Sequence, residues 1–395
     1  MQMKPFLAAL SAVLVAGCTG SSNTNTATAV TTGTAVVAAA STDYQSGAIS
    51  LVQTTTPFTA QNSEDATISD ISVRAGTDHF FIIQRYGTDQ ISRYEASSPS
   101  MPTYTYSTND SDSVDSNPYD IVELNSTKAY LIRYGAGSVW IVNPSATTEA
   151  DFKIGEIDLS QYSSSGVPEM SAGLISNGKL YVAMQVLDEN FNATQPGYVA
   201  VIDTSTDTEI TTGSSSAPLK GILLPTYDPY RLVAVPGSDN IIVAADGGYA
   251  EGNDGYSHVY NGGIVSINPD NGYATTLVLD DGDSSSHPYG AIVDVSVAAV
   301  DRGYFLGNSD VGGSDTLYRF DPTGATAPVA VTGFANLQLS AISVYPLDGN
   351  LWVGQPATTA PGLSVLGFAN GTETVVEPLI GTVLNPLNID FMTNP

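Results

Sequence analysis

Cysteine, histidine and basic residues are scarce in this sequence, and each shortage argues against a class of protein. The 395 residues include one cysteine, so no pair exists to form a disulfide within the chain. Three histidines are too few for a metal site built from several imidazoles. A Gly-x-Ser-x-Gly elbow and a Cys-x-x-Cys-His haem-attachment motif are both missing. The sequence therefore offers little support for an enzyme.

Positive charge is also scarce, because 12 Lys and Arg residues stand against 40 Asp and Glu residues, for a net charge of −28. Such a surface repels phosphates and anionic lipid headgroups, so we expect no nucleic-acid partner. The excess acid suits cation binding, but solubility outside the cell is a simpler explanation.

Long hydrophobic runs are confined to the N-terminus, and no later run approaches the ~20 residues of a membrane-spanning helix. An uncharged run over Pro5–Val15 follows Lys4 and has the length of a signal-peptide core. It ends in Val15-Ala16-Gly17-Cys18, which resembles the bacterial lipobox. The resemblance implies a lipoprotein signal peptide over residues 1–17 and acylation of Cys18. An ordinary signal peptide that happens to contain a cysteine is the alternative.

Acylation at Cys18 would supply several chains, each worth about 0.8 kcal/mol per buried CH₂, and hence a stable membrane anchor. Thr19 follows in place of aspartate, which by the sorting rule of such lipoproteins implies the outer membrane. The orientation, toward the cell surface or the periplasm, stays open. Residues 18–33 are mostly Ser, Thr, Asn, Gly and Ala, and we interpret them as a flexible tether.

From residue 34 to residue 395 the sequence shows short β-rich runs separated by Gly, Pro, Asn and Asp, with no sustained helical period. The runs recur at about fifty residues, the length of a four-stranded propeller blade. The second strand of each repeat is an apolar run, seen at residues 80–83, 129–132, 180–183, 241–244, 304–306 and 351–353. A proline marks the start of the innermost strand at Pro118, Pro168, Pro229, Pro288 and Pro386. Asp70-Ile71 and Asn336-Leu337 take the equivalent place in two further repeats.

Six complete repeats leave a seventh that is divided between the two ends of the chain. Residues 386–391 form an inner strand with nothing after it, whereas residues 35–38 and 48–52 resemble second and third strands with no first strand. We therefore predict an all-β, seven-bladed β-propeller in which N- and C-terminal strands complete one blade.

The segment Gly197-Tyr198-Val199-Ala200-Val201-Ile202-Asp203-Thr204 resembles the YVTN family of propeller repeats. The likeness is close in this blade, looser in the next, and faint elsewhere. Members of that family include surface-layer proteins and relatives of lactonases, so the resemblance implies the fold more than an activity.

Connection lengths distinguish the two faces of the expected disc. Links from first to second and from third to fourth strands are tight turns such as Asn177-Gly178 and Asp348-Gly349. Links between blades and from second to third strands are long and polar, as at residues 107–117, 188–196, 246–263 and 280–287. Long loops on a rigid scaffold usually carry binding residues, so we expect function on this long-loop face.

Two arginines lie at equivalent places on that face, within Arg85-Tyr86-Gly87 and Arg133-Tyr134-Gly135. Together they would form a fork for a carboxylate or another anion. The alternative is a pair of salt bridges to neighbours such as Asp120.

Acidic loops on the same face provide a hypothetical calcium site, because carboxylates alternating with Asn and Gly suit a cation that takes six to eight oxygen ligands. No loop has the EF-hand spacing, and solvated acidic loops are the alternative. The candidate ligands are Asp110, Asp112 and Asp115 in one loop and Asp280, Asp281 and Asp283 in another, with residues 246–254 as a third acidic loop.

Tyr119, Tyr230 and Tyr289 each follow a blade-start proline, where they would line the channel mouth and stack on a sugar, or pack between blades. His287 is the best candidate for a general base or ligand on the long-loop face, and Asp246 is its candidate acid–base partner.

Two functional hypotheses follow. The leading one is a lipid-anchored binding or scaffold protein of the cell envelope whose propeller face meets a protein or glycan partner, with no cofactor. The alternative is a cation-dependent hydrolase or lactonase-like enzyme that acts at the channel mouth.

Overall fold

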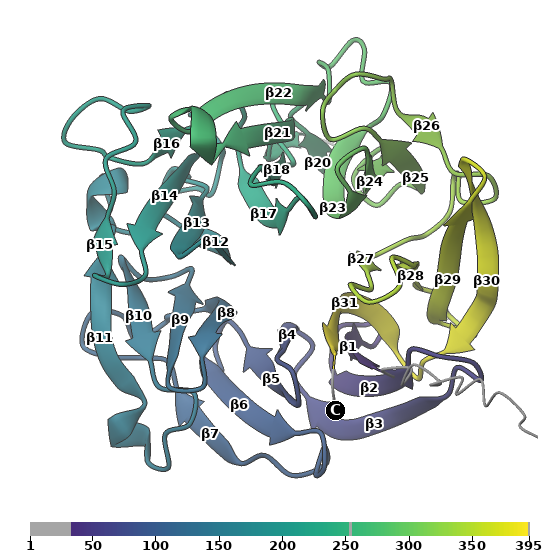
Figure 1. The fold of residues 1–395 in the computed structure, drawn as a ribbon, viewed down its shortest axis with the longest axis horizontal. Helices are drawn as coiled ribbons and strands as arrows, with labels where there is room; N and C mark the ends of the chain where they lie inside the picture. Colours follow the sequence, from purple (N-terminus) through teal and green to yellow (C-terminus); the bar gives the residue numbers. More distant parts are fainter. Residues whose placement is uncertain (1–32, 253–254, 394–395) are drawn as a thin grey trace, which may run out of the picture. The chain divides into compact units, whose positions relative to one another are not determined.

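The computed structural model describes residues 33–252 and 255–393, which form seven β-sheets arranged as a ring around a central opening, together with one two-stranded sheet (Figure 1). Every blade is antiparallel, with its first strand innermost and its fourth at the rim. This confirms the predicted seven-bladed β-propeller. No helical segment within these residues is long and apolar enough to cross a bilayer.

The blades are numbered from the N-terminus. Blade 1 contains β31 (Asn385–Met392), β1 (Thr34–Ala40), β2 (Gly47–Gln53) and β3 (Ala60–Thr67). Blade 2 contains β4 (Ile71–Ala75), β5 (His79–Gln84), β6 (Gln90–Glu95) and β7 (Tyr104–Ser107). Blade 3 contains β8 (Pro118–Asn125), β9 (Lys128–Arg133), β10 (Ser138–Val142) and β11 (Lys153–Asp158). Blade 4 contains β12 (Met170–Ser176), β13 (Lys179–Met184), β14 (Tyr198–Asp203) and β15 (Thr208–Glu209), with β16 (Ile222–Leu223) paired to β14.

Blade 5 contains β17 (Pro229–Ala234), β18 (Ile241–Ala245), β21 (Gly263–Asn268) and β22 (Ala274–Asp280), and a hairpin of β19 (Tyr249–Gly252) and β20 (Gly255–His258) extends from it. Blade 6 contains β23 (Ala291–Ala299), β24 (Arg302–Asn308), β25 (Asp315–Phe320) and β26 (Val329–Ala330). Blade 7 contains β27 (Ile342–Val344), β28 (Leu351–Gln355), β29 (Gly362–Ala369) and β30 (Thr372–Gly381). The helical content of the described residues is three single 3₁₀ turns, at Glu149–Asp151, Ser160–Tyr162 and Pro269–Asn271.

The core lies between blades, which explains why the second strands are apolar on both faces. On β9, Tyr130 and Ile132 pack against blade 4, whereas Ala129 and Leu131 pack against blade 2. A strand with a neighbouring sheet on each side shows a continuous apolar run instead of an alternating one. The run that marks each repeat in the sequence is therefore the strand that both neighbouring blades cover.

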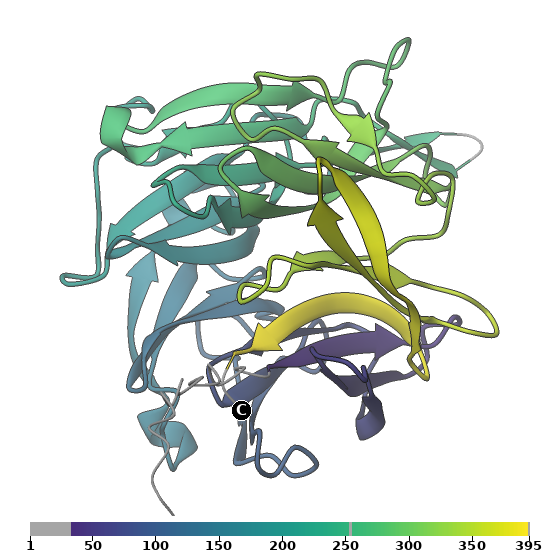
Figure 2. The same cartoon turned by 45° about the vertical axis from the view of Figure 1, so that its right-hand side comes forward.

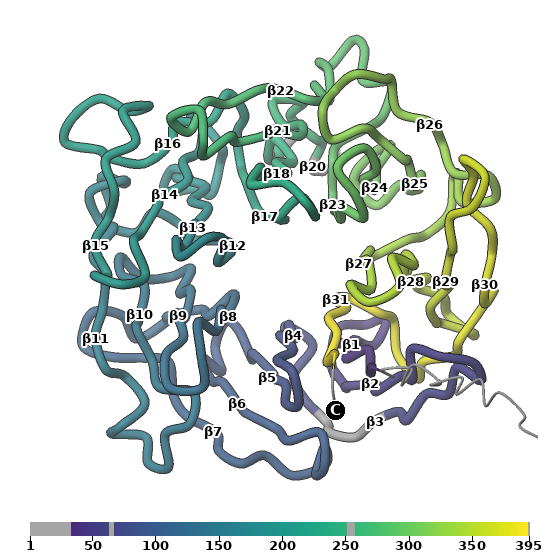
Figure 3. Tube along the Cα trace, viewed as in Figure 1, coloured from purple at the N-terminus to yellow at the C-terminus, as the bar shows by residue number. Residues whose placement is uncertain are grey.

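The C-terminal strand closes the ring. β31 pairs antiparallel with β1, with Val37 opposite Ile389, and Figure 3 shows the yellow trace of β31 beside the purple trace of β1. Figure 2 shows the same pair from another direction. Ile389, Phe391 and Met392 are at most 5% exposed, so β31 contributes to the core as well as to the ladder. The predicted division of one blade between the two ends of the chain is confirmed.

The inner strands begin near the marked positions, with one displacement. β8 starts at Pro118, β17 at Pro229 and β4 directly after Asp70. Blade 7 differs, because its inner strand starts at Ile342, five residues after Leu337. Leu337 instead forms an isolated β-bridge with Asp315 of blade 6, which holds the chain away from the channel until the strand begins.

Candidate functional site

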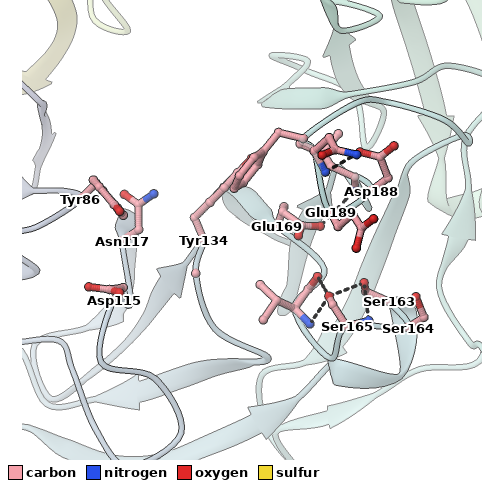
Figure 4. Close-up of a pocket in the computed structure, with 15 residues that line it drawn as sticks. Tyr86, Asp115, Asn117, Tyr134, Ser163, Ser164, Ser165, Glu169, Asp188 and Glu189 are labelled. Atoms are coloured by element: carbon pink, nitrogen blue, oxygen red, sulfur yellow. Dashed lines mark hydrogen bonds between the residues drawn. The ribbon is translucent and has the colours of Figure 1, made fainter.

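Loops of blades 2, 3 and 4 on the long-loop face enclose a cavity of about 780 Å³ (Figure 4). They are the loops that follow β5, β7, β9, β11 and β13. No described lining residue is basic. The cavity is lined by Tyr86, Asp115, Asn117, Tyr134, Gly135, Ser163, Ser164, Ser165, Val167, Glu169, Leu187, Asp188, Glu189, Asn190 and Phe191. Such a surface offers hydrogen-bond acceptors, hydroxyls and aromatic faces to a ligand.

Two aromatic side chains of this lining face solvent. Tyr86 in the β5–β6 loop is 67% exposed, and Phe191 in the β13–β14 loop is 69% exposed. In Figure 4, Tyr86 lies with Asp115 and Asn117 on one side of the cavity, while Glu169, Asp188 and Glu189 lie on the other. Exposed rings at the rim of a cavity provide apolar contact area for a ligand, and a loop with only polar side chains does not.

A row of stacked side chains leads from the channel mouth to the cavity. The Arg85 guanidinium lies 4.7 Å from the centroid of the Tyr119 ring, which stacks on Tyr134 with centroids 4.4 Å apart. The Tyr134 hydroxyl donates to Oε1 of Gln185 at 2.8 Å. Burial raises the pKa of the Tyr134 hydroxyl, so this group stays a neutral donor at physiological pH.

Glu169 is the buried carboxyl of the cavity wall, with 8% of its surface exposed. Burial raises the pKa of Glu169 to about 7. The hydrogen bond that the Leu187 N–H donates to Oε2 at 3.1 Å acts in the opposite direction, because it stabilises the ionised carboxylate. The nearby charge of Asp228 raises this pKa further. Glu169 therefore exchanges protons near neutral pH.

Behind Gln185 the carboxyls of Asp228 and Asp246 are hydrogen-bonded to each other, and Gln185 also bonds Asp228. Oδ1 of Asp246 accepts the Gly248 N–H at 2.8 Å. Burial raises the pKa of both carboxyls, and that of Asp246 is raised further by the charge of Asp228. Two acids in contact hold one proton between them, because ionising both would place like charges side by side.

Asp281 continues this acidic region toward blade 6. It is fully buried, its Oδ2 accepts the Gly262 N–H at 3.2 Å, and burial raises its pKa to about 7. Its charge also raises the pKa of Asp246. Glu169, Asp228, Asp246 and Asp281, which we call the carboxylate row, thus influence one another across blades 4 and 5.

His287 does not join Asp246 in an acid–base pair. Its ring stacks on Tyr260 with centroids 4.0 Å apart, and Nδ1 lies 2.9 Å from the Asp283 carbonyl oxygen. The loop before β23 holds the imidazole against Tyr260. The carboxyl next to Asp246 is Asp228, which the sequence analysis did not single out.

The two arginines of the expected fork have separate partners. Arg133 is fully buried; its Nη1 and Nη2 donate to the Asp112 carboxylate at 2.8 and 2.9 Å, and its guanidinium lies 4.1 Å from the Trp140 ring centroid. Arg85 pairs with Asp70. The structure therefore brings no anion fork together. Asp120 pairs with neither of them, because it binds Arg74 in the channel.

The tyrosines after the blade-start prolines take three different positions. Tyr119 stacks in the row described above. Tyr230 lines the channel, and its hydroxyl donates to the Ile292 carbonyl at 3.0 Å. Tyr289 packs edge-on against Phe305 and Tyr318 within blade 6. Only Tyr119 reaches the neighbourhood of the cavity.

Two of the three proposed calcium ligands of the first loop already pair with basic side chains. Asp110 pairs with Lys153 at 2.6 Å, Asp112 pairs with Arg133, and Asp115 lines the cavity. In the second loop, Oδ1 of Asp280 accepts the Gly282 N–H, and Oδ1 of Asp283 accepts the Ser285 and Ser286 N–H groups. Within the described part of the chain, no three His, Cys, Asp or Glu side chains are gathered for a metal ion. Residues 253–254, and Cys18 with the whole signal sequence and most of the tether, lie outside the described residues.

The central channel, with a volume of about 930 Å³, is a second concave region and carries an ionic belt. Arg74 donates from Nε and Nη2 to the Asp120 carboxylate at 2.9 and 2.7 Å, and its Nη1 lies 4.0 Å from Asp390. Asp120 and Asp390 each accept a backbone N–H of the next blade, from Gly173 and Ala75. These groups tie blades together, which indicates a structural role.

Sequence reasoning missed Glu169, Asp228, Gln185 and Phe191. A signal for two of them exists, because Glu169 follows Pro168 and Asp228 precedes Pro229, where the chain enters an inner strand. Both residues have a positive φ, near 51° and 56°, as does Asn117 before Pro118. A polar residue beside a blade-start proline therefore recurs at this rim of the channel.

Comparison with known proteins shows structural likeness at low sequence identity. No family model and no curated protein sequence matches this chain. One similar solved structure is a candidate 6-phosphogluconolactonase from Bacteroides uniformis, with 10% identity, a TM-score of 0.62, and coverage of 91% of this chain and 99% of that one. AztD from Citrobacter koseri has 14% identity, a TM-score of 0.50, and coverage of 92% of this chain and 98% of its own. Virginiamycin B lyase from Staphylococcus aureus has 14% identity, a TM-score of 0.50, and coverage of 80% of this chain and 90% of its own. The likeness is one of fold. The resemblance to YVTN repeats stays a prediction.

Proposed function

We propose that this chain is a lipid-anchored binding protein of the cell envelope that holds a glycan in the cavity of blades 2 to 4. The observation that supports this most is the exposed pair Tyr86 and Phe191, which come from different blades and flank a lining of carboxylates, amides and hydroxyls. Sugar rings present C–H faces that pack on aromatic side chains and hydroxyls that donate to carboxylates.

Charge argues for such a ligand over an anionic one. Four acidic side chains line the cavity, at Asp115, Glu169, Asp188 and Glu189, and no described lining residue is basic. A phosphate or sulfate group would meet repulsion there, whereas a sugar hydroxyl would meet acceptors.

A glycan array probed with the full chain in detergent tests the proposal, followed by calorimetric titration of each hit. The double variant Tyr86→Ala/Phe191→Ala should bind about 5- to 150-fold more weakly, because two stacking contacts are worth roughly 1–3 kcal/mol together. Met101→Ala is the matched control, since Met101 is also 67% exposed but lies in the β6–β7 connection on the opposite face. Equal binding by all three proteins would refute this site. If the array shows no glycan binding but a stoichiometric protein is captured with the chain from its native membrane, the ligand of this face is a protein and not a glycan.

An enzymatic role is a second candidate, and Glu169 is the observation that favours it. A carboxyl with a pKa of about 7 is half protonated at neutral pH and can act as a general acid. The likeness of fold to a lyase and to a candidate lactonase is consistent with this role, at identities that imply nothing more. Turnover of glycosides or lactones by the full chain, abolished by Glu169→Gln, would support this candidate. No turnover across such a panel would count against it.

The anchor is part of the same proposal and rests on Cys18 in its lipobox-like context. Metabolic labelling with an alkyne fatty acid should mark the wild-type chain in outer-membrane fractions. Cys18→Ala should lose both the label and the membrane association. Label retained in that variant would exclude acylation at this residue.

A further inference from the structure

The contact between Asp228 and Asp246 leaves two acids without a positive partner. Their side chains bond each other, Gln185, the Gly248 N–H and Tyr249. Among the described residues, neither carboxyl forms a salt bridge with Lys, Arg or His, although seven carboxylates elsewhere pair with arginine. Asp228 is buried and Asp246 is half-buried. Acids removed from water are normally paired with a cation or bind a metal, so this pair needs an explanation.

Buried carboxylate oxygens without a hydrogen-bond donor provide an independent observation in the same region. Asp228 is 8% exposed, and its Oδ1 atom is buried without a donor from the described residues. Asp281, whose charge acts on Asp246, is fully buried and also has a buried Oδ1 without a donor. Buried oxygens without a donor are rare in native proteins and often mark an ion or a water. Two of them in one acidic region point to a ligand that is positively charged.

We propose that Asp228 and Asp246 together bind one calcium ion. Two carboxylates neutralise its charge, and neutral oxygens of the surrounding loops and water complete the six to eight ligands that calcium takes. On binding, both acids are ionised, the shared proton passes to solvent, and two metal–oxygen contacts form. No oxidation or reduction takes place.

The chemistry of the donors favours calcium over other common metals. The pair offers only oxygen, whereas zinc and copper sites in proteins are built mainly from imidazole and thiolate. Magnesium demands near-ideal octahedral geometry and gives up its water reluctantly, which suits two irregular loop carboxylates poorly. The site differs from the loops of Asp110 and Asp283, whose carboxylates have protein partners.

This ion would lie behind the cavity, not in it. Gln185 connects Asp228 to the Tyr134 hydroxyl, and Tyr134 lines the cavity. The inference is therefore independent of which ligand the cavity takes, and a cavity with no glycan would leave it intact.

Calorimetric titration of calcium chloride into the chelator-stripped full chain at pH 7.5 tests the proposal. We expect one site, and an apparent enthalpy that changes with the ionisation enthalpy of the buffer because about one proton is released per ion. Asp228→Asn and Asp246→Asn should each weaken binding by at least about 100-fold, since each removes half of the compensating charge. Asp280→Asn is the matched control, because Asp280 is the exposed last residue of β22 and its substitution should leave binding unchanged.

Thermal melting of the same proteins with and without calcium tests whether the variants are correctly folded. Without calcium, Asp246→Asn should melt no lower than the wild type, because the amide can donate to the Asp228 carboxylate in place of the shared proton. With calcium, only the wild type and Asp280→Asn should gain thermal stability. Absence of a calcium isotherm in the wild type would overturn the proposal, as would equal binding by the Asp246→Asn protein.

Discussion

Replacing Glu169 by glutamine should stabilise this protein at alkaline pH and leave it unchanged in acid. Glu169 is 8% exposed and accepts the Leu187 N–H, and the amide oxygen of glutamine can accept the same bond. The substitution thus keeps size and hydrogen bonding and removes only the charge that the buried site disfavours.

The direction follows from the raised pKa. The pKa of Glu169 rises from 4.5 to about 7 on folding, so the folded state holds the extra proton between these pH values. Stability contributed by the protonated form is complete below pH 4.5 and is lost as pH rises toward 7. At about 1.4 kcal/mol per unit of pKa, the ionised form lowers the free energy of unfolding by roughly 3 kcal/mol above pH 7.

Urea unfolding of the wild type and of Glu169→Gln at pH 4.5 and pH 8.5, with a chelator present, measures this effect. We expect no difference at the lower pH and about 3 kcal/mol in favour of Glu169→Gln at the higher pH. Glu189→Gln is the control, because Glu189 is exposed in a loop of the same cavity and should show no such dependence. Equal stability of wild type and Glu169→Gln at pH 8.5 would refute the buried, proton-exchanging state of Glu169.

Three further predictions concern the scaffold. Truncation before β31 removes three buried apolar side chains, each worth roughly 1.5–3 kcal/mol, and their sum is comparable to the whole stability of a domain. Circular dichroism of the truncated protein should therefore show no cooperative melting, and a normal melting curve would contradict the closure of the ring by β31. Asp112→Asn leaves the buried Arg133 guanidinium without its carboxylate and should cost about 2–4 kcal/mol in urea unfolding, whereas a cost below 0.5 kcal/mol would show that the pair contributes little. Gly307→Ala places a Cβ 1.9 Å from the Tyr289 carbonyl oxygen and should lower the melting temperature by several degrees; an unchanged melt would argue against that close approach.

The architecture could be predicted from the sequence because the information is local. A second strand such as β9 is covered by blades on both sides, so it is an apolar run that can be recognised without knowing the partners. Turn residues and blade-start prolines separate these runs, and a half-blade at each end of the chain implies that the two ends meet. The start of β27 was misplaced because the bridge between Leu337 and Asp315 is a contact between blades, which no local pattern records.

The site could be predicted only as a face. Long loops indicated the correct rim, and Tyr86, Tyr134 and Asp115 among the singled-out residues do line the cavity. Their partners come from other blades, so sequence spacing did not reveal them.

By itself the sequence determined the number of blades, the closure and the acidic character of the protein, since these follow from residue types and their period. Only the tertiary structure decided which carboxyls meet. Asp228 and Asp246 meet because folding pairs the start of β17 with the end of β18, where Pro229 lies opposite Ala245, and burial then raises the pKa of both carboxyls. Arg133 does not take part in the expected anion site for a corresponding reason, because folding buries it against Asp112 and Trp140. Burial and charge contacts between distant segments set the chemistry of a side chain, and they exist only after folding.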